Sequence, residues 1–190
     1  MKRFFTLFLS LVLLTLSACS VQRFSDVKMF ERKFNKQLVW AELDSKEALI
    51  TNADGEVQYN FILSPDSKTD FLIRLYATEE NLSIKRCTVT VSASVQDMNK
   101  DTIMTFREIC SAVTTVFSNE KDNPTEVFEE LFIPTAGNFT QAVPQYAQTR
   151  FYRYTYSANN TGAYFCAENK SLCSESEPEL TLRSYEGNGE

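Results

Sequence analysis

The sequence predicts an α+β fold: a largely antiparallel sheet with about three packed helices. Apolar residues recur at every second position in segments between residues 57 and 95, which is typical of strands. They recur at every third or fourth position in residues 27–38 and 103–117, which is typical of amphipathic helices. The resulting order of one helix, several strands, two helices and several strands favours helices packed on an antiparallel sheet.

The chain begins with a secretory signal pattern. Lys2 and Arg3 precede an apolar run at residues 4–16. This run is shorter than the roughly 20 apolar residues that a membrane-spanning helix needs. Leu16-Ser17-Ala18-Cys19 follows, and this tetrapeptide resembles the lipobox of bacterial lipoproteins. The alternative is an ordinary cleaved signal with a chance cysteine.

The resemblance implies that residues 1–18 are removed as a signal peptide and that the thiol of Cys19 carries diacylglycerol. Two or more acyl chains bind a membrane stably, so no transmembrane helix is required. The protein is then expected to be exported and lipid-anchored to the cell envelope. The residue after the cysteine is Ser20. In cells with two membranes, a serine at this position resembles the signal that sorts lipoproteins to the outer membrane.

Removal of the signal leaves 172 of the 190 residues. They are expected to comprise a short lipid-anchored tether, residues 19–24, and a single domain, residues 25–190.

The first predicted helix begins at Ser25, whose side chain suits the N-cap position. The residues on its predicted buried side are Val27, Phe30, Phe34 and Leu38. The segment 47–64 predicts two strands that meet at an Asp54-Gly55 turn. The residues expected to share one face of the second strand are Val57, Tyr59, Phe61 and Leu63.

Residues 71–77 and 82–95 are predicted to pair as the next two strands. The more apolar face of the second strand consists of Cys87, Val89, Val91, Ala93 and Val95. Asn99 or Asp101 is expected to open the second helix. Its apolar stripe consists of Ile103, Phe106, Cys110, Val113 and Phe117.

The third helix is predicted to begin with Asn123 as cap and Pro124 at its first position, and to stop at Pro134 and Gly137. Residues 134–145 are predicted to form a loop, because they contain two prolines and few charges. The later strands are expected at residues 150–157, 163–168 and 180–185.

The four cysteines of the mature chain predict two disulfides, Cys87 with Cys110 and Cys166 with Cys173. The strand and helix patterns point Cys87 and Cys110 inward, where a helix packed on a strand can bring two thiols together. Cys166 and Cys173 flank six mostly polar residues and would join the end of a hairpin. Buried thiols and a zinc site are the alternatives, but a spacing of six is wide for zinc and the chain has no histidine.

Charge is unevenly distributed along the mature chain, which carries 17 basic and 25 acidic residues, a net charge of −8. Residues 20–38 hold five basic and two acidic residues, and the remainder is therefore at −11. The basic residues near the anchor are Arg23, Lys28, Arg32, Lys33 and Lys36. We expect this segment to face anionic lipid headgroups, with a merely solvated helix face as the alternative, and we expect no nucleic-acid partner.

The sequence offers no recognisable catalytic set. The absence of histidine excludes Ser-His-Asp and Cys-His pairs and His-ligated metals, and the five glycines form no phosphate-binding loop. Ser25 and Lys28 match an SxxK pattern without its companion motifs, so capping explains Ser25 better. Glu79-Glu80 and Glu129-Glu130 are typical of solvated turns and helix faces. We expect no catalytic residue, cofactor or metal site.

Tyr152, Tyr154 and Tyr156 alternate along one predicted strand and therefore share one face. Two interpretations remain open. If the face is buried, the rings belong to the core, which we favour. If it is exposed, they form a flat surface suited to a protein or sugar partner.

An anchor and a core without a catalytic set favour a non-catalytic envelope protein that binds a protein partner or supports an envelope assembly. A module for a small ligand or glycan, with the tyrosine face as its platform, is one alternative. A small enzyme inhibitor is another, because compact lipoproteins that block lysozyme or proteases are similar in broad architecture, although no motif is shared.

Overall fold

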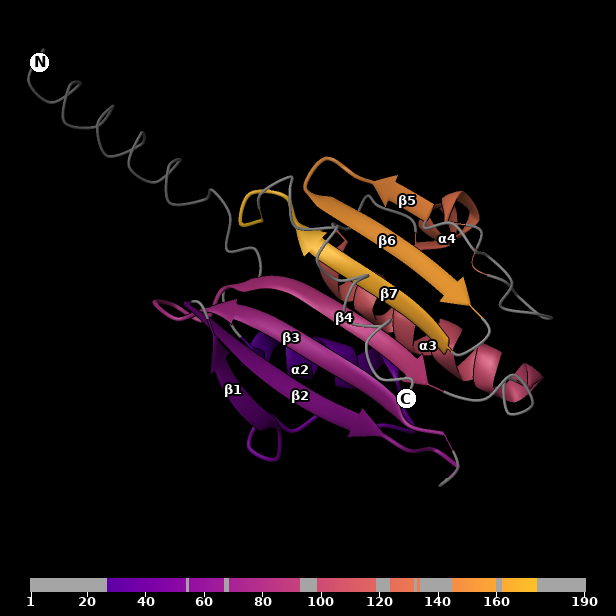
Figure 1. Ribbon diagram of the computed structural model, residues 1–190, viewed down its shortest axis with the longest axis horizontal. Helices are drawn as coiled ribbons and strands as arrows, with labels where there is room; N and C mark the ends of the chain where they lie inside the picture. Colours follow the sequence, from indigo (N-terminus) through magenta and orange to yellow (C-terminus); the bar gives the residue numbers. More distant parts are fainter. Residues whose placement is uncertain are drawn as a thin grey trace, which may run out of the picture.

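The computed structural model describes residues 27–53, 55–66, 69–92, 99–118, 124–131, 133, 145–159 and 162–173. It confirms the α+β class. A seven-stranded antiparallel sheet has the order β1-β2-β3-β4-β7-β6-β5, and α2 and α3 lie against one of its faces (Figure 1). No helix in these ranges is long and apolar enough to cross a membrane.

The described part of the chain forms three helices and seven strands. The helices are α2 (Val27–Gln37), α3 (Lys100–Phe117) and α4 (Pro124–Glu130). The strands are β1 (Leu49–Ala53), β2 (Glu56–Leu63), β3 (Phe71–Thr78), β4 (Ile84–Ser92), β5 (Gln145–Gln148), β6 (Tyr152–Asn159) and β7 (Gly162–Asn169).

The predictions for the first half of the chain are confirmed in these elements. The predicted apolar side of α2 is buried, as is the side of β2 that carries Tyr59, Phe61 and Leu63. Gly55 has a φ of +75° between β1 and β2, a left-handed conformation that glycine adopts without strain. The predicted cap Ser25 lies outside the described residues, and so do Ala93 and Val95.

Helix α3 connects the two halves of the core. Asn99 is its N-cap, and its side-chain oxygen accepts a hydrogen bond from the backbone N–H of Thr102 at 2.9 Å. The whole predicted apolar stripe is buried. Phe117, at its last turn, meets Phe30 of α2 at 6.0 Å between ring centroids and Tyr152 of β6 at 5.6 Å, both edge to face.

The second half differs from expectation in two respects. Residues 145–148 form β5 at the sheet edge, a strand that the sequence pattern does not predict, and only its first residue, Gln145, belongs to the predicted loop. The strand is held there because Ala147 pairs with Tyr154 of β6 and is buried against the core. Helix α4 ends at Glu130, before the predicted stop at Pro134. Pro134, Gly137, Asn123 and the predicted strand at 180–185 lie outside the described residues.

The predicted disulfides are not present, and this part of the prediction is wrong. None of the four described cysteines forms a disulfide, although all are buried. Cys87 and Cys110 do point into the core, but an inward direction does not fix the short Cβ separation that a disulfide requires. Cys166 faces the opposite side of the sheet, in register with Thr88 and Thr155, and the thiol of Cys173 donates to the Lys85 carbonyl at 3.5 Å.

The sheet face away from the helices carries a buried ion pair. Glu168 of β7 is 3% exposed, and its Oε2 lies 2.7 Å from Nη2 of Arg153 on β6. Nε of Arg153 also donates to the same oxygen at 2.8 Å. Although burial opposes the charged form of Arg153, the hydrogen bond and charge of Glu168 raise the pKa of its guanidinium. The guanidinium of Arg153 therefore stays charged, and its contacts with Glu168 fix β6 beside β7.

Candidate protein-binding surface

The tyrosine ladder does not form an open surface. Tyr152, Tyr154 and Tyr156 are each at most 1% exposed, on the side of β6 that packs against the helices. Phe106 of α3 and Phe165 of β7 lie beside Tyr156 and Tyr154, respectively. The exposed-platform interpretation is therefore wrong, and the rings belong to the core.

The basic residues near the predicted anchor lie on the solvent side of α2. Lys28, Arg32, Lys33 and Lys36 are all exposed, opposite the buried Phe30 and Phe34. Cys19 and Arg23 lie outside the described residues. Four of the five predicted basic positions thus share one accessible helix face.

The buried thiols are not placed for nucleophilic chemistry. Burial raises the pKa of the Cys87 thiol, and the neighbouring Cys166 raises it further. Burial also raises the pKa of the Cys110 thiol, and the nearby Cys87 raises it further. Burial raises the pKa of the Cys166 thiol in the same way, and the charge of Glu168 raises it further. These thiols are protonated at neutral pH, and a protonated thiol is a weak nucleophile and metal ligand.

The acidic pairs do not assemble a reaction centre either. Glu79 and Glu80 are exposed in a turn, and Glu129 and Glu130 are exposed on α4. Within the described ranges, no three Cys, Asp or Glu side chains are grouped to hold a metal ion.

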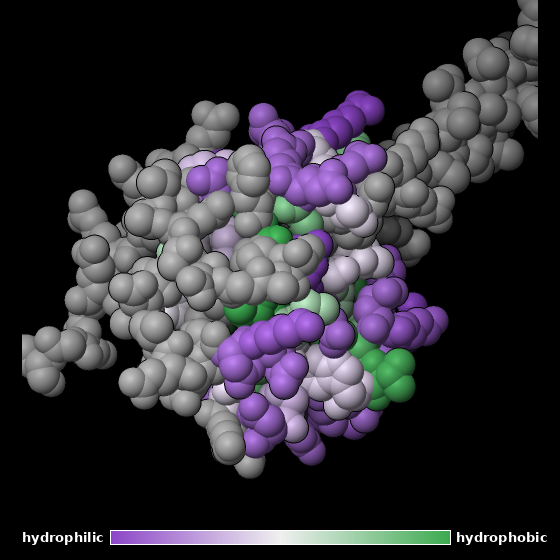
Figure 2. All heavy atoms as spheres, turned by 90° about the vertical axis from the view of Figure 1, so that its right-hand side faces the viewer, coloured by the Kyte–Doolittle hydropathy of each residue, from purple (hydrophilic) through white to green (hydrophobic). Residues whose placement is uncertain are grey.

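Exposed apolar side chains are concentrated in one stretch of the chain. The large apolar residues that are exposed in the described part are Val39, Trp40, Leu49, Ile50, Ile62, Leu82, Met104, Tyr146 and Leu172. Five of these nine fall within residues 39–62, and we call those five the 39–62 surface. Most of the described residues visible in Figure 2 are hydrophilic, with apolar groups between and beside them.

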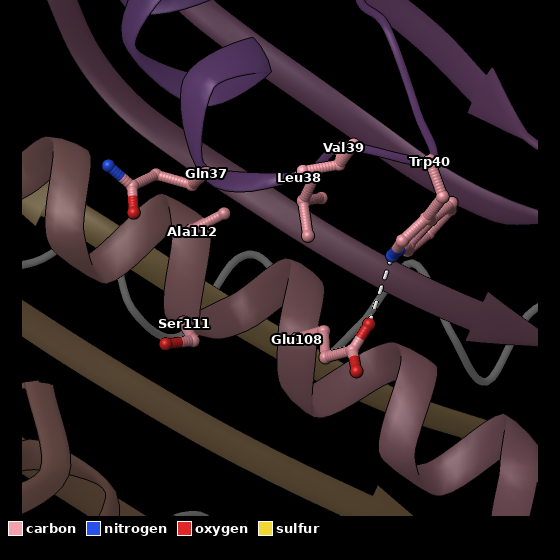
Figure 3. A pocket seen from close by; sticks show the side chains of 7 residues that line it. All are labelled: Gln37, Leu38, Val39, Trp40, Glu108, Ser111 and Ala112. Carbon is pink, nitrogen blue, oxygen red and sulfur yellow. Dashed lines mark hydrogen bonds between the residues drawn. The ribbon is translucent and has the colours of Figure 1, made fainter.

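The first part of the 39–62 surface is a hollow beside Trp40. The indole Nε1 of Trp40 donates to Oε2 of Glu108 on α3 at 3.0 Å (Figure 3), which fixes the ring while 43% of the residue stays exposed. An open hollow of about 360 Å³ lies between this segment and α3, with Ser111 and Ala112 on its helix side. Val39 is 98% exposed at its rim.

The second part is a notch at the sheet edge. Strand β1 pairs with β2 only as far as Asn60, whereas β2 continues through Leu63. The loop of residues 42–48 borders the uncovered end of β2 and leaves an open hollow of about 270 Å³, which we call the β1 notch. Its walls include the exposed apolar side chains of Leu49 and Ile62.

Helix α2 holds the loop that borders the notch. The Asn35 side chain donates to the Leu43 carbonyl at 2.8 Å and accepts from the Leu43 N–H at 2.9 Å. Oε2 of Glu31 accepts from the Ser45 N–H at 2.9 Å. The loop therefore has a defined conformation, and the notch is preformed.

The two hollows are lined by neighbouring parts of the chain and share acidic surroundings. Trp40 and Glu42 are two residues apart, so their Cα atoms are separated by at most about 7 Å. Glu42, Asp44 and Glu47 line the notch, and Glu108 borders the Trp40 hollow. Apolar side chains with a charged rim are typical of protein interfaces, and tryptophan is enriched among the residues that dominate their affinity.

The sequence patterns do not predict this surface. The available signal was the chain's single tryptophan, placed beside a valine in the segment that follows an amphipathic helix. The exposure of β1 had no such signal, because its apolar residues are equally consistent with a buried strand.

We predict that the protein loses stability above about pH 9. Unfolded thiols ionise near a pKa of about 8.5, whereas the folded thiol of Cys110 has a raised pKa and keeps its proton. The unfolded state then binds fewer protons, so the free energy of unfolding falls by up to about 1.4 kcal/mol per pH unit for each such thiol.

Urea unfolding of the wild type and of Cys110→Ala between pH 7 and pH 10 measures the contribution of this thiol. We expect the stability difference between the two proteins to be constant below pH 8 and to shrink above pH 9. A difference that does not change with pH would contradict the prediction.

Comparisons with known proteins give no relative. No protein-family model matches the chain, and neither a curated protein nor a solved structure matches it significantly.

Proposed function

We propose that this chain is a lipid-anchored, non-catalytic protein of the cell envelope that binds a protein partner through the 39–62 surface. The observation that carries the binding role is the exposure of five large apolar side chains in one stretch of the chain. Val39 and Trp40 border the hollow at α3, Leu49 and Ile62 border the notch, and Ile50 follows Leu49 on β1. Side chains of this size lower the free energy when a partner removes them from water, by about 1.5–3 kcal/mol each when fully buried.

The lipobox sequence supports the anchor. Leu16-Ser17-Ala18-Cys19 follows a basic start and an apolar run of suitable length. In this proposal the acyl chains on Cys19 hold the protein at the membrane, in the outer membrane where the cell has two.

The exposed basic face of α2 supports an orientation towards the lipid. Lys28, Arg32, Lys33 and Lys36 lie within 17 residues of Cys19 along the chain and point to solvent. Anionic headgroups attract such residues within about one Debye length, roughly 8–10 Å. The acyl chains supply the attachment, and α2 determines which side faces the membrane.

We predict that mass spectrometry of the mature N-terminal peptide will find Cys19 as its first residue, with the mass of diacylglycerol on the thiol. A chain made with Ala at position 19 should lack this mass and should not be cut before position 19. An unmodified Cys19, or a mature chain that starts elsewhere, would contradict the anchor.

We predict that the unlipidated chain, residues 20–190, binds anionic vesicles through α2. Replacement of Lys28, Arg32, Lys33 and Lys36 by Gln should lower partitioning by up to about fivefold per charge at low salt. Co-sedimentation with vesicles of increasing anionic lipid content measures this. Lys100→Gln, an exposed lysine on α3, is the matched control; equal binding by all variants would remove the orientation from the proposal.

We predict that a photoreactive residue at Val39 cross-links a protein partner in intact cells. The same residue at Glu79, in an exposed turn outside the 39–62 surface, is the control and should give no adduct. Trp40→Ala should lower the Val39 yield at least tenfold, because buried tryptophans at interface centres contribute about 2 kcal/mol or more. Equal yields at Val39 and Glu79, or no adduct at either, would refute the binding role.

A further inference from the structure

In the described ranges, strand β1 leaves one edge of the sheet open. It is the terminal strand of the sheet and pairs only with β2. Within the part of the chain that the structure describes, its outward edge makes no backbone hydrogen bond. Its first four residues are all exposed, with Leu49 at 70% and Ile50 at 50%.

This edge lacks the features that usually protect an edge strand. Natural edges carry charges or proline, are very short, or are covered by another element. Residues 49–53, LITNA, contain neither a charge nor a proline. The opposite edge, β5, has only four residues and packs against α4. Among the residues that the structure describes, α4 thus packs against one edge strand, whereas the outward edge of β1 makes no backbone hydrogen bond.

The β1 notch extends this edge with a pocket for a side chain. The last three residues of β2, Phe61–Leu63, pair with β3 but have no β1 partner. Leu43 is buried behind them, and Ile62 is 66% exposed at the mouth. A strand laid along β1 would therefore reach an apolar pocket at the Leu49 end.

The charge around this pocket selects a basic occupant. Glu42 and Glu47 line the notch and are exposed. Neither carboxylate takes part in a hydrogen bond or an ion pair within the described ranges. Both charges lie at the Leu49 end of β1, beside the pocket, and are available to a lysine or arginine of a partner.

We propose that β1 is a docking strand for an extended segment of a partner protein. The segment adds to the sheet by backbone hydrogen bonds, inserts an apolar side chain into the β1 notch and places a Lys or Arg beside Glu42 and Glu47. This inference rests on the proposed protein-binding function and specifies its mode. Strand addition takes affinity from the backbone and specificity from alternate side chains.

The sheet geometry also sets the direction of the segment. Every pairing in this sheet is antiparallel, and antiparallel pairs are slightly more stable per residue than parallel ones. Because the notch lies at the N-terminal end of β1, an antiparallel segment reaches it with its C-terminal half. The basic residue therefore belongs near the C-terminal end of the segment.

Selection of peptides from a random 12-residue phage library on the purified full-length chain tests this mode. We expect the enriched peptides to alternate apolar residues, to lack a central proline and to carry Lys or Arg towards the C-terminus. Amide hydrogen exchange should show that a bound peptide protects residues 49–53 and leaves β5 unchanged.

Two surface variants with matched controls identify the site. Ile50→Lys should weaken peptide binding at least tenfold, whereas Met104→Lys, on an exposed residue of α3, should not change it. Replacement of Glu42 and Glu47 by Gln should weaken binding of basic peptides about tenfold and should abolish much of its salt dependence. The same change at Glu79 and Glu80 is the control. Unchanged urea midpoints establish that each variant is folded.

Several outcomes would overturn the proposal. The first is that no peptide is enriched on the chain. The second is that the peptides bind Ile50→Lys as tightly as the wild type. The third is that a bound peptide protects amide hydrogens outside β1 and not those of β1. A dimer that forms through β1 in the absence of peptide would also overturn it, because the occupant would then be a second copy of the chain. If Val39 still cross-links a partner and Ile50→Lys has no effect, strand addition fails while the protein-binding function survives. If no partner cross-links at all, the function itself fails.

Discussion

The pairing of β4 with β7 is the constraint on which the rest of the structure depends. It joins residues 86–92 to residues 162–168, so that two separate sets of strands become one sheet. Helix α3 lies between them in the chain and contacts both strands, while its Phe117 reaches α2 on one side and β6 on the other. The tyrosine ladder is buried because this pairing brings β6 and β7 beneath the helix layer.

A consequence of this arrangement is that the cysteines occupy both faces of the sheet. Cys87 and Cys110 belong to the helix-packed side, and Cys166 faces the other way beside the polar row that contains Glu168. The core is formed by aromatic and aliphatic packing around α3, and the thiols act as small buried side chains within it. Stability of this fold therefore comes from burial across the sheet rather than from covalent cross-links.

Helix α2 connects the two halves of the proposed function. Its solvent side presents four basic residues, and its Asn35 and Glu31 hold the loop that borders the β1 notch. We propose that α2 rests against anionic lipid. The same helix shapes the acidic β1 notch, which we propose binds a basic segment of the partner. In this proposal the membrane and the partner use different residues, because the basic side chains lie at positions 28–36 and the acidic ones at positions 42–47.

The sequence by itself determined the local elements of this protein. Periodicity located α2, α3 and β2–β4, and it placed Phe30, Phe106 and Cys110 on buried faces, because which side of an element is apolar is a local property. Only the tertiary structure decided what these faces meet. The β4–β7 pairing, the short strand β5, the absence of disulfides and the exposure of β1 all depend on contacts between residues distant in the chain. The alternation of apolar residues cannot report whether a strand lies at the centre of a sheet or at its edge, and the 39–62 surface arises from that difference.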